Sequence, residues 1–490
     1  MATIKELSEK RPWLNWVLFI GTVIIVFILG IFAASIVERR TEAQLYFQMV
    51  EPLPEFEPRN VVWGRNFPRQ YESYRQTLDT TFESKYYGSV MIDYLEKYPE
   101  LVIMWAGYAF ARDYNQGRGH YYSVKDLHQT LRTVQPQPAT CWTCKSTDVP
   151  RMMHQLGVDE FYSRTWSDLG SEIINPIGCQ DCHDPETMNL RITRPALAEA
   201  FQRQGRNIDH ASHQEMRSLV CAQCHVEYYF GDKNYLVFPW DDGFGAGDIE
   251  AYFDRIEHVD WVHALSRAPM LKAQHPDYEH YKTGIHAERG VSCADCHMPY
   301  KRDGGIKFTN HHLQSPLNNI EGSCQVCHRE SEETLLQNVY DRQSKVSELR
   351  RITEQHLARL HLEAGVAWDA GATEQEMEEV LQLIRHAQWR WDWVAAANSM
   401  GFHAPNESLS VLATSIDKAQ EARVILARIF NRHGVSQPVE LPDFSTKEKA
   451  QQVIGLNIDE IERANREFMN NTVPQWIEEA AKRQELYIYH

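Results

Sequence analysis

The sequence predicts a mainly α-helical fold with little β structure and with long helices at its C-terminal end. From residue 331 onward, apolar residues recur every three to four positions over long stretches, which is the spacing of one helix face. Between residues 101 and 330, few segments alternate apolar and polar side chains, and Gly, Pro and Asn interrupt them often. That same region holds all ten cysteines of the chain.

The ten cysteines form five C-x-x-C pairs, and four pairs are followed by histidine, although histidine makes up only 22 of 490 residues. C-x-x-C-H is the attachment signature of haem c. Repeated close pairs are poor disulfides, and zinc, the main alternative, needs four ligands per site and no histidine at a fixed place. We therefore predict five covalent haems c and a core packed around them. The attachment residues are Cys141, Cys144, Cys179, Cys182, His183, Cys221, Cys224, His225, Cys293, Cys296, His297, Cys324, Cys327 and His328.

The first pair, CWTCK, has Lys145 where the other four pairs have histidine. An iron bound by two histidines is saturated and only transfers electrons, whereas catalysis needs an open coordination position. We therefore predict four electron-transfer haems and one catalytic haem with Lys145 as its ligand. Lysine binds iron only as a neutral amine, so burial and the charge of the metal must lower its pKa. The alternative is that Lys145 is a surface side chain and that another residue binds this iron.

The N-terminal residues 1–40 are predicted to be a membrane anchor or a signal segment. Residues 13–37 carry no charge and form an apolar run long enough to span a bilayer. Lys5, Lys10 and Arg11 precede the run, which predicts a cytoplasmic N-terminus and export of the rest. We favour an uncleaved anchor on the periplasmic side of the bacterial cytoplasmic membrane, where haem c is attached. The alternative is a cleaved signal peptide and a soluble periplasmic protein.

Two regions follow this segment. Residues 41–330 are predicted to form the pentahaem catalytic region, and residues 331–490 a region of long helices. Within the latter, amphipathic helices are expected over 344–365, from 377 to a stop at Gly401, and from 409 to a stop at Gly434. These helices are a candidate dimer interface, although packing within one chain would explain them equally well.

The charge of the chain excludes some functions. Its formal net charge is −17, and it contains no basic tract for nucleic acid. It also lacks a G-x-G-x-x-G or P-loop fingerprint between a strand and a helix, so nothing indicates nucleotide binding.

Four motifs carry a resemblance to a known family: CWTCK, CAQCHVEYYF at 221–230, LKAQH at 271–275 and HAQWRWD at 386–392. With them the chain resembles the pentahaem, ammonia-forming cytochrome c nitrite reductases over essentially everything after the N-terminal segment. The resemblance implies a dissimilatory nitrite reductase that converts nitrite to ammonium with six electrons. One alternative is a multihaem enzyme that reduces hydroxylamine or sulfur oxyanions, although such enzymes typically carry more haems. Another is a non-catalytic electron carrier, which the missing fifth histidine disfavours.

The resemblance also implies the substrate pocket. Arg132, Tyr228 and His275 would lie above the iron bound by Lys145, and Arg118 is a rival for the arginine. A guanidinium can bind and orient the nitrite anion, while histidine and tyrosine can donate protons as N–O bonds break. Arg132 lies nine residues before Cys141, and this loop is short for the family.

Calcium, the distal haem ligands and the partners are implied in the same way. Glu227 and Gln274, with carbonyl oxygens of Tyr228 and Lys272, would bind calcium, a cation that prefers oxygen ligands. The family commonly dimerises and takes electrons from a membrane-bound multihaem quinol dehydrogenase. The expected distal ligands are His120 for the haem of Cys221 and Cys224, His286 for that of Cys324 and Cys327, His403 for that of Cys293 and Cys296, and His311, with His312 as the alternative, for that of Cys179 and Cys182.

Overall fold

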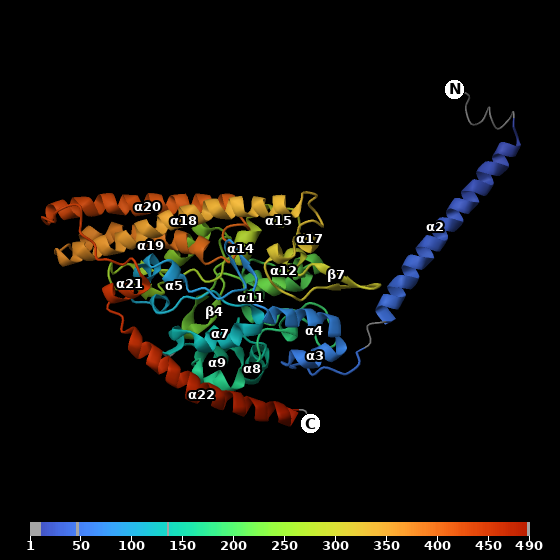
Figure 1. The fold of residues 1–490 in the computed structure, drawn as a ribbon, viewed down its shortest axis with the longest axis horizontal. Coiled ribbons are helices and arrows are strands. Elements are labelled where there is room, and N and C mark those ends of the chain that lie inside the picture. The colour runs from blue at the N-terminus through green and yellow to red at the C-terminus, as the bar shows by residue number, and fades with distance from the viewer. Residues whose placement is uncertain (1–10, 46–48, 135–136, 488–490) are drawn as a thin grey trace. The chain divides into compact units, whose positions relative to one another are not determined.

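Short helices and loops make up residues 53–330, and the long helices α18, α19, α20 and α22 follow (Figure 1). The computed structural model describes residues 11–45, 49–134 and 137–487. These residues fall into two units, 1–52 and 53–490. The predicted mainly helical fold with few short strands is confirmed.

The first unit contains the helix α2 (Trp13–Leu45). Its segment Trp13–Glu38 has a mean hydropathy of 3.0 and is not buried by other parts of the protein, so it is long and apolar enough to cross a membrane. A signal sequence has the same properties, so both predicted roles remain open. Lys5 and Lys10, which set the predicted orientation, lie outside the described residues.

The part of the second unit before residue 331 consists of short elements. Its α-helices are α3 (Asn60–Asn66), α4 (Pro68–Arg75), α5 (Tyr94–Lys97), α6 (Glu100–Met104), α7 (Ser123–Gln129), α8 (Val149–Leu156), α9 (Val158–Ser163), α10 (Cys179–Cys182), α11 (Pro195–Arg203), α12 (His213–Ala222), α13 (Ala246–Arg255), α14 (Asp277–Lys282), α15 (Ile285–Glu288), α16 (Cys293–His297) and α17 (Ile320–Ser323). The 3-10 helices are η1 (Gln76–Leu78), η2 (Ala109–Ala111), η3 (His120–Tyr122), η4 (Leu131–Val134), η5 (Ala139–Trp142), η6 (Ser167–Glu172), η7 (Ile208–His210), η8 (Asp232–Asn234) and η9 (Pro316–Asn318). Helices of this length are not stable alone, so tertiary contacts must hold them.

The strands form four separate antiparallel pairs. They are β1 (Glu83–Ser84) with β2 (Tyr87–Gly88), β3 (Tyr229–Phe230) with β4 (Leu236–Val237), β5 (Trp261–Val262) with β6 (Pro269–Met270), and β7 (Tyr300–Asp303) with β8 (Ile306–Thr309). The β5–β6 pair matters for the site because the segment 271–275 follows it directly.

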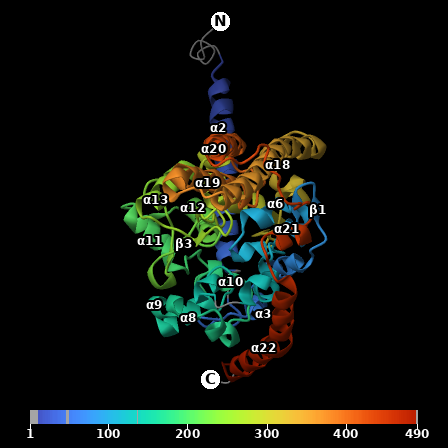
Figure 2. The same cartoon turned by 90° about the vertical axis from the view of Figure 1, so that its left-hand side faces the viewer.

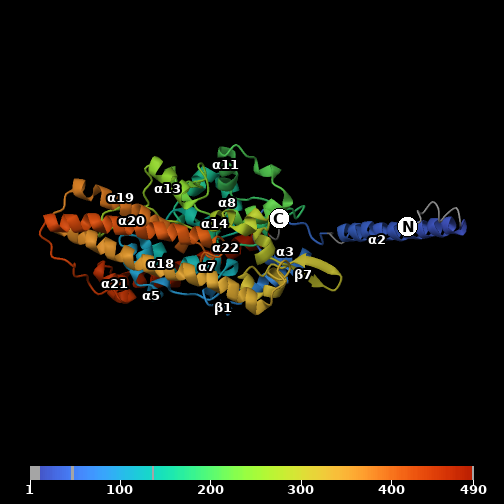
Figure 3. The same cartoon turned by 90° about the horizontal axis from the view of Figure 1, so that it is seen from above.

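Three long helices lie side by side on one face of the second unit, as Figures 1, 2 and 3 show: α18 (Glu332–Asp369), α19 (Glu374–Ala395) and α20 (Pro405–Arg432). All three were predicted from their apolar periodicity, which gives each helix a buried stripe. Thr373 caps α19, because its hydroxyl accepts a hydrogen bond from the Glu376 backbone N–H at 3.3 Å. This helix ends at Ala395, earlier than the stop predicted at Gly401.

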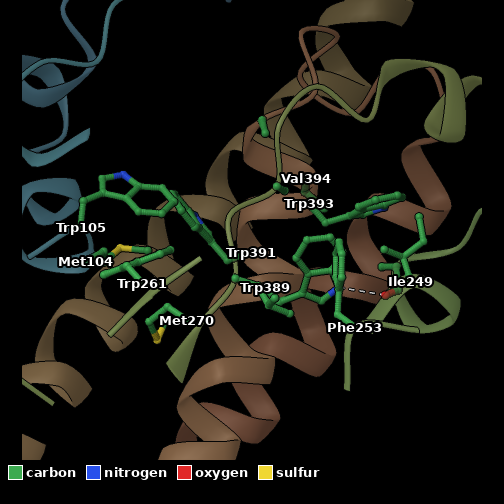
Figure 4. Close-up of a cluster of buried hydrophobic side chains, with 14 of the residues drawn as sticks. Met104, Trp105, Ile249, Phe253, Trp261, Met270, Trp389, Trp391, Trp393 and Val394 are labelled. Atoms are coloured by element: carbon green, nitrogen blue, oxygen red, sulfur yellow. Dashed lines mark hydrogen bonds between the residues drawn. The ribbon is translucent and has the colours of Figure 1, made fainter. Parts of the chain in front are cut away.

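Helix α19 attaches these long helices to the rest of the unit through a cluster of tryptophans (Figure 4). It contributes Trp389, Trp391 and Trp393, which are fully buried. Trp391 packs on Trp105, whose ring also lies 5.4 Å from that of Trp261 in β5. The indole N–H of Trp389 donates to the carbonyl of Ala246 at 2.9 Å. The cluster therefore joins α19 to α6, α13 and β5.

Two further helices, α21 (Lys447–Val453) and α22 (Ile458–Tyr487), complete the chain. In Figures 1 and 2, α22 lies on the side opposite α18, α19 and α20. Its Trp476 packs so closely on Gly170 that a Cβ at position 170 would clash. Arg483 forms an ion pair with Glu172 at 3.0 Å, and Asn465 donates to the carbonyl of Thr130 at 3.3 Å. This helix therefore holds η6 and the segment before Arg132.

Substitution of Gly401 tests the packing of the turn between α19 and α20 on α18. Gly401 has φ of +77° in this turn, and a Cβ there would lie 2.7 Å from the Val346 side chain of α18. Gly434 has a similar φ of +72° with nothing within 4 Å. We expect Gly434→Ala to cost about 1–2 kcal/mol through backbone strain alone. Gly401→Ala should cost about 1–3 kcal/mol more, because it also overpacks the contact with α18. Urea unfolding of the holoprotein measures both, and equal losses would contradict the role of Val346.

Candidate active site

Among the described residues of the second unit, four pairs of histidines have ring centroids 6.1–6.4 Å apart, and they are the four predicted pairs. A fifth pair, His263 and His361, stacks at 3.7 Å, too close to hold a metal ion between its rings. Two imidazoles bound to one metal ion, each nitrogen about 2 Å from it, have ring centroids about 6 Å apart. Each of the four predicted pairs is therefore spaced to hold one metal ion between its rings. The centroid distances are 6.1 Å for His120 and His225, 6.1 Å for His183 and His311, 6.4 Å for His286 and His328, and 6.3 Å for His297 and His403. His311, not His312, faces His183.

The other ring nitrogen of several of these histidines has its own acceptor. Nδ1 of His183 lies 2.9 Å from the carbonyl of Met188, and Nδ1 of His297 lies 2.9 Å from that of Gln314. Nδ1 of His311 lies 2.8 Å from the carbonyl of Thr309. A histidine that donates from Nδ1 has a fixed tautomer with Nε2 free, which is the arrangement of metal-binding histidines. Burial lowers the pKa of His311 to about 4, so the ring is neutral and able to bind a metal.

The cysteine pairs lie against one another. All ten cysteines belong to the described part of the chain, and none forms a disulfide. The thiols of Cys144 and Cys224 lie within hydrogen-bonding reach. Fully buried Arg194 joins two attachment segments, because it donates to the carbonyl of Thr143 at 2.9 Å and pairs with Asp181 at 2.6 Å. Covalent cofactors attached to these segments would lie close enough to exchange electrons.

The unusual motif CWTCK begins in η5. Trp142 is buried and stacks on Trp166 with ring centroids 4.9 Å apart, which fixes the segment. Lys145 is half-buried, and its carbonyl accepts a hydrogen bond from the Ser123 hydroxyl at 2.7 Å. Its charge acts on His275, whose pKa falls to about 3, mainly through burial and next through Lys145. Lys145 and His275 therefore share one neighbourhood.

Tyr228 and Arg132 also belong to that neighbourhood. Burial raises the pKa of Tyr228 far above its usual range, and the thiols of Cys144 and Cys141 act in the same direction. The pKa of Cys141 rises to about 11 through burial, while the charge of Arg132 opposes the rise. The structure thus brings all four predicted catalytic residues around the first cysteine pair.

The two candidate arginines differ in their partners. Arg118 forms an ion pair with Asp126, so its charge is already neutralised. Arg132 lies in η4, donates from Nε to the Thr130 hydroxyl at 3.1 Å, and has no acidic partner among the described residues. Thr130 is in turn bound to Asp113 at 2.8 Å. Of the two, Arg132 is therefore the one that has no acidic partner in the described part of the chain; its guanidinium stacks on the ring of Phe110 at 4.3 Å.

The predicted calcium ligands meet beside this pocket. Glu227 is fully buried, and its Oε2 accepts a hydrogen bond from the Gln274 backbone N–H at 2.7 Å. Its Oε1 has no hydrogen-bond partner in the described part of the chain, and burial raises the pKa of the carboxyl far above its usual range. Such an oxygen fits a cation ligand, since buried polar atoms are normally paired. In the described residues, no group of three His, Cys, Asp or Glu side chains is placed to hold a metal ion. A calcium site here would therefore depend on carbonyl and amide oxygens in addition to Glu227.

Asp392, which was not predicted to belong to the site, binds the segment 271–275. Its carboxylate accepts hydrogen bonds from the Lys272 amine at 2.8 Å and from the Ala273 backbone N–H at 2.7 Å. Lys272 and Asp392 are both almost completely buried, and Asp392 lies on α19. The only signal in the sequence was its position at the end of the motif HAQWRWD. This ion pair ties the segment that carries His275 to the long helices.

Three comparisons show what the chain is similar to. The model of the cytochrome c552 family matches residues 60–484. A cytochrome c-552 from Porphyromonas gingivalis is 54% identical over 482 residues, which cover 96% of this chain and 97% of the relative. A cytochrome c-552 from Aliarcobacter butzleri is 42% identical over 483 residues, which cover 95% of each chain.

Among solved structures, the catalytic subunit of a cytochrome c nitrite reductase from Desulfovibrio desulfuricans, described with two calcium sites, matches with a TM-score of 0.73. The two chains are 32% identical, and the match covers 84% of this chain and 91% of that one. This likeness confirms the predicted fold class, a mainly helical multihaem cytochrome fold.

The buried ion pair yields the second prediction. Asp392→Ala leaves the Lys272 charge buried without a partner, and we expect a loss of about 3–5 kcal/mol in the free energy of unfolding. The double variant Lys272→Met with Asp392→Leu, which has no buried charge, should recover most of that loss. Thermal or urea unfolding of the holoproteins measures the difference. A double variant as unstable as Asp392→Ala would contradict the electrostatic explanation.

Proposed function

The chain belongs to the cytochrome c552 family, and from this premise we propose that it is a dissimilatory nitrite reductase that converts nitrite to ammonium. The reaction consumes six electrons and eight protons and yields ammonium and two waters. The observation that carries the proposal is the contrast between four histidine pairs and one site with lysine. Four cofactors with two axial histidines each would transfer electrons, and the fifth would bind substrate.

Each C-x-x-C pair would hold one haem c through thioether bonds, which gives five haems per chain. The facing histidines would hold the irons of four haems, with His311 serving the haem of Cys179 and Cys182. Their spacing and their free Nε2 atoms support the assignment. Lys145 would bind the fifth iron through its neutral amine.

The residues of the pocket have separate roles. When bound, the haem of Cys141 and Cys144, held also by Lys145, would supply electrons and an open iron position for nitrite. Arg132, whose charge has no acidic partner in the described residues, binds the oxygens of nitrite and orients the anion. His275 has a pKa of about 3 and is therefore a neutral imidazole that donates a hydrogen bond from one ring nitrogen. Tyr228 keeps its phenolic proton, because its pKa is raised, and its hydroxyl donates a hydrogen bond to the same oxygens.

The calcium ion, when bound to Glu227, Gln274 and the carbonyls of Tyr228 and Lys272, would fix the backbone between two catalytic side chains. Tyr228 is adjacent to Glu227, and His275 is adjacent to Gln274. The hydrogen bond between Glu227 and the backbone of Gln274 already joins the two segments. Calcium would therefore set the distance between Tyr228 and His275.

The surroundings of the protein are proposed on the same basis. The chain would face the periplasm, held by α2 or released after cleavage, and would receive electrons from a membrane-bound multihaem quinol dehydrogenase. Two copies would associate through the C-terminal helices. Exposed apolar side chains on α18 and α20, among them Ile352 and Val424, support this contact.

Turnover tests the function directly. Holoprotein with a reduced viologen donor should consume six electrons per nitrite and release one ammonium, and haem analysis should give five haems per chain. Lys145→Leu should abolish turnover while the four histidine-paired haems keep their low-spin spectra. Full turnover in that variant would exclude lysine as the essential ligand. A holoprotein that accepts electrons but leaves nitrite unchanged would point to hydroxylamine, to sulfite or to electron transfer alone.

Calcium yields a separate prediction. Chelation should destabilise the protein, because it leaves the buried Glu227 carboxylate without a counter-charge. Adding calcium back at 100 times its Kd should restore about 2.7 kcal/mol. Glu227→Gln should remove the calcium response in thermal unfolding, whereas Glu57→Gln, at a buried glutamate paired with Arg59, should preserve it. An unchanged response in Glu227→Gln would disprove this site.

A further inference from the structure

One histidine that follows a cysteine pair differs from the others in the partner of its second nitrogen. Nδ1 of His225 lies 3.3 Å from the carboxylate oxygen Oδ2 of Asp277. The corresponding partners of His183 and His297 are the backbone carbonyls of Met188 and Gln314. A carboxylate carries a full negative charge, so it attracts the imidazole proton more strongly than a neutral carbonyl does.

Asp277 is held firmly in this position. It is the first residue of α14 and is only 8% exposed. Its Oδ1 accepts a hydrogen bond from the Asn398 backbone N–H at 2.7 Å, and its Oδ2 accepts one from the Asn398 side chain at 2.7 Å. The side chain is therefore held in a fixed orientation toward His225.

The same turn reaches the substrate pocket. The Asp277 backbone N–H donates to the carbonyl of His275 at 2.7 Å, and the next residue, Tyr278, donates from its backbone N–H to the carbonyl of His225 at 3.1 Å. Cys224, beside His225, lies within hydrogen-bonding reach of Cys144 in the unusual motif. Through these contacts, Asp277 connects the predicted catalytic centre to the segment that would hold the haem of His225.

A carboxylate behind a metal-bound imidazole increases the basicity of that ligand. A more basic ligand stabilises ferric iron relative to ferrous iron and lowers the reduction potential, and hydrogen bonding around the axial ligand is one of the means by which proteins tune haems. The other histidines that follow cysteine pairs have no such carboxylate contact among the described residues. The effect should therefore be specific to one haem.

We propose that Asp277 is a positioning residue that lowers the reduction potential of the haem held by His120 and His225, and that it fixes this ligand to the turn carrying His275. The proposal rests on the haem assignment of the proposed function, but not on nitrite turnover. A haem of low potential beside the catalytic one has a strong tendency to pass its electron on, which favours complete reduction of bound substrate.

Potentiometric titration of the holoprotein, followed by visible and EPR spectra, tests the proposal. Asp277→Asn should raise the reduction potential of one low-spin haem. We expect the equilibrium constant for its reduction to increase at least tenfold, which corresponds to about 59 mV for a one-electron couple. Asp277→Glu, which keeps the carboxylate, should stay closer to the wild-type value. A His120→Met background marks the haem of Cys221 and Cys224 spectrally and shows whether it is the one that shifts.

Asp295→Asn is the matched control. This substitution removes the same charge from inside another attachment motif. The carboxylate of Asp295, however, contacts Arg217 at 2.9 Å and the Ser292 backbone N–H, not a histidine. Equal shifts in Asp277→Asn and Asp295→Asn, or a five-haem Asp277→Asn protein with no shift in the marked haem, would overturn the proposal. If Asp277→Asn does not assemble, the size-matched pair Asp277→Glu and Asp277→Gln decides, since only charge distinguishes them. Haem content and turnover, recorded separately, show whether the haem assignment or the nitrite activity has failed instead.

Discussion

The spacing of paired imidazoles is the constraint on which the rest of this structure depends. Two rings on opposite sides of one metal ion lie about 6 Å apart, and four histidine pairs in the described residues have this spacing. The members of each pair come from different short elements, such as η3 for His120 and α15 for His286. Helices of one or two turns have little stability of their own, so packing and the proposed cofactors would supply what local structure cannot. This would explain how a region of more than two hundred residues can fold with regular elements that are so short.

The long helices act as the frame against which these short elements are held. The tryptophans of α19 contact α6, α13 and β5, and Asp392 of the same helix binds the segment that carries His275. On the other side, α22 packs on Gly170 and holds the carbonyl of Thr130, two residues before Arg132. The proposed substrate pocket is therefore supported from two directions by helices that contribute none of its proposed ligands. Loops positioned in this way can keep catalytic side chains in place without strands or long helices.

Buried charge is the second recurring feature. Arg194 with Asp181 and Lys272 with Asp392 both lie at contacts between segments that carry predicted cofactor or substrate residues. A buried pair adds little net stability, because desolvation opposes the attraction, but it strongly penalises any arrangement that separates the partners. Such pairs therefore specify position more than they add stability. Arg132 is different, since it keeps its charge unpaired within the described residues, as an anion-binding residue must.

The sequence by itself determined what depends on local spacing. The C-x-x-C-H repeats, the lysine at position 145 and the apolar periodicity of the three long helices are all visible in neighbouring residues. The bounds of the helices were less well predicted, since α18 begins at Glu332 and not near residue 344, and α19 ends before Gly401. The resemblance to a family supplied the pairing of distant histidines, which local spacing could not. Only the tertiary structure decided that His225 meets Asp277, 52 residues away, and that Lys272 meets Asp392, 120 residues away. The physical reason is that a hydrogen bond depends on where two backbones meet in space, and no periodicity along the chain encodes that meeting.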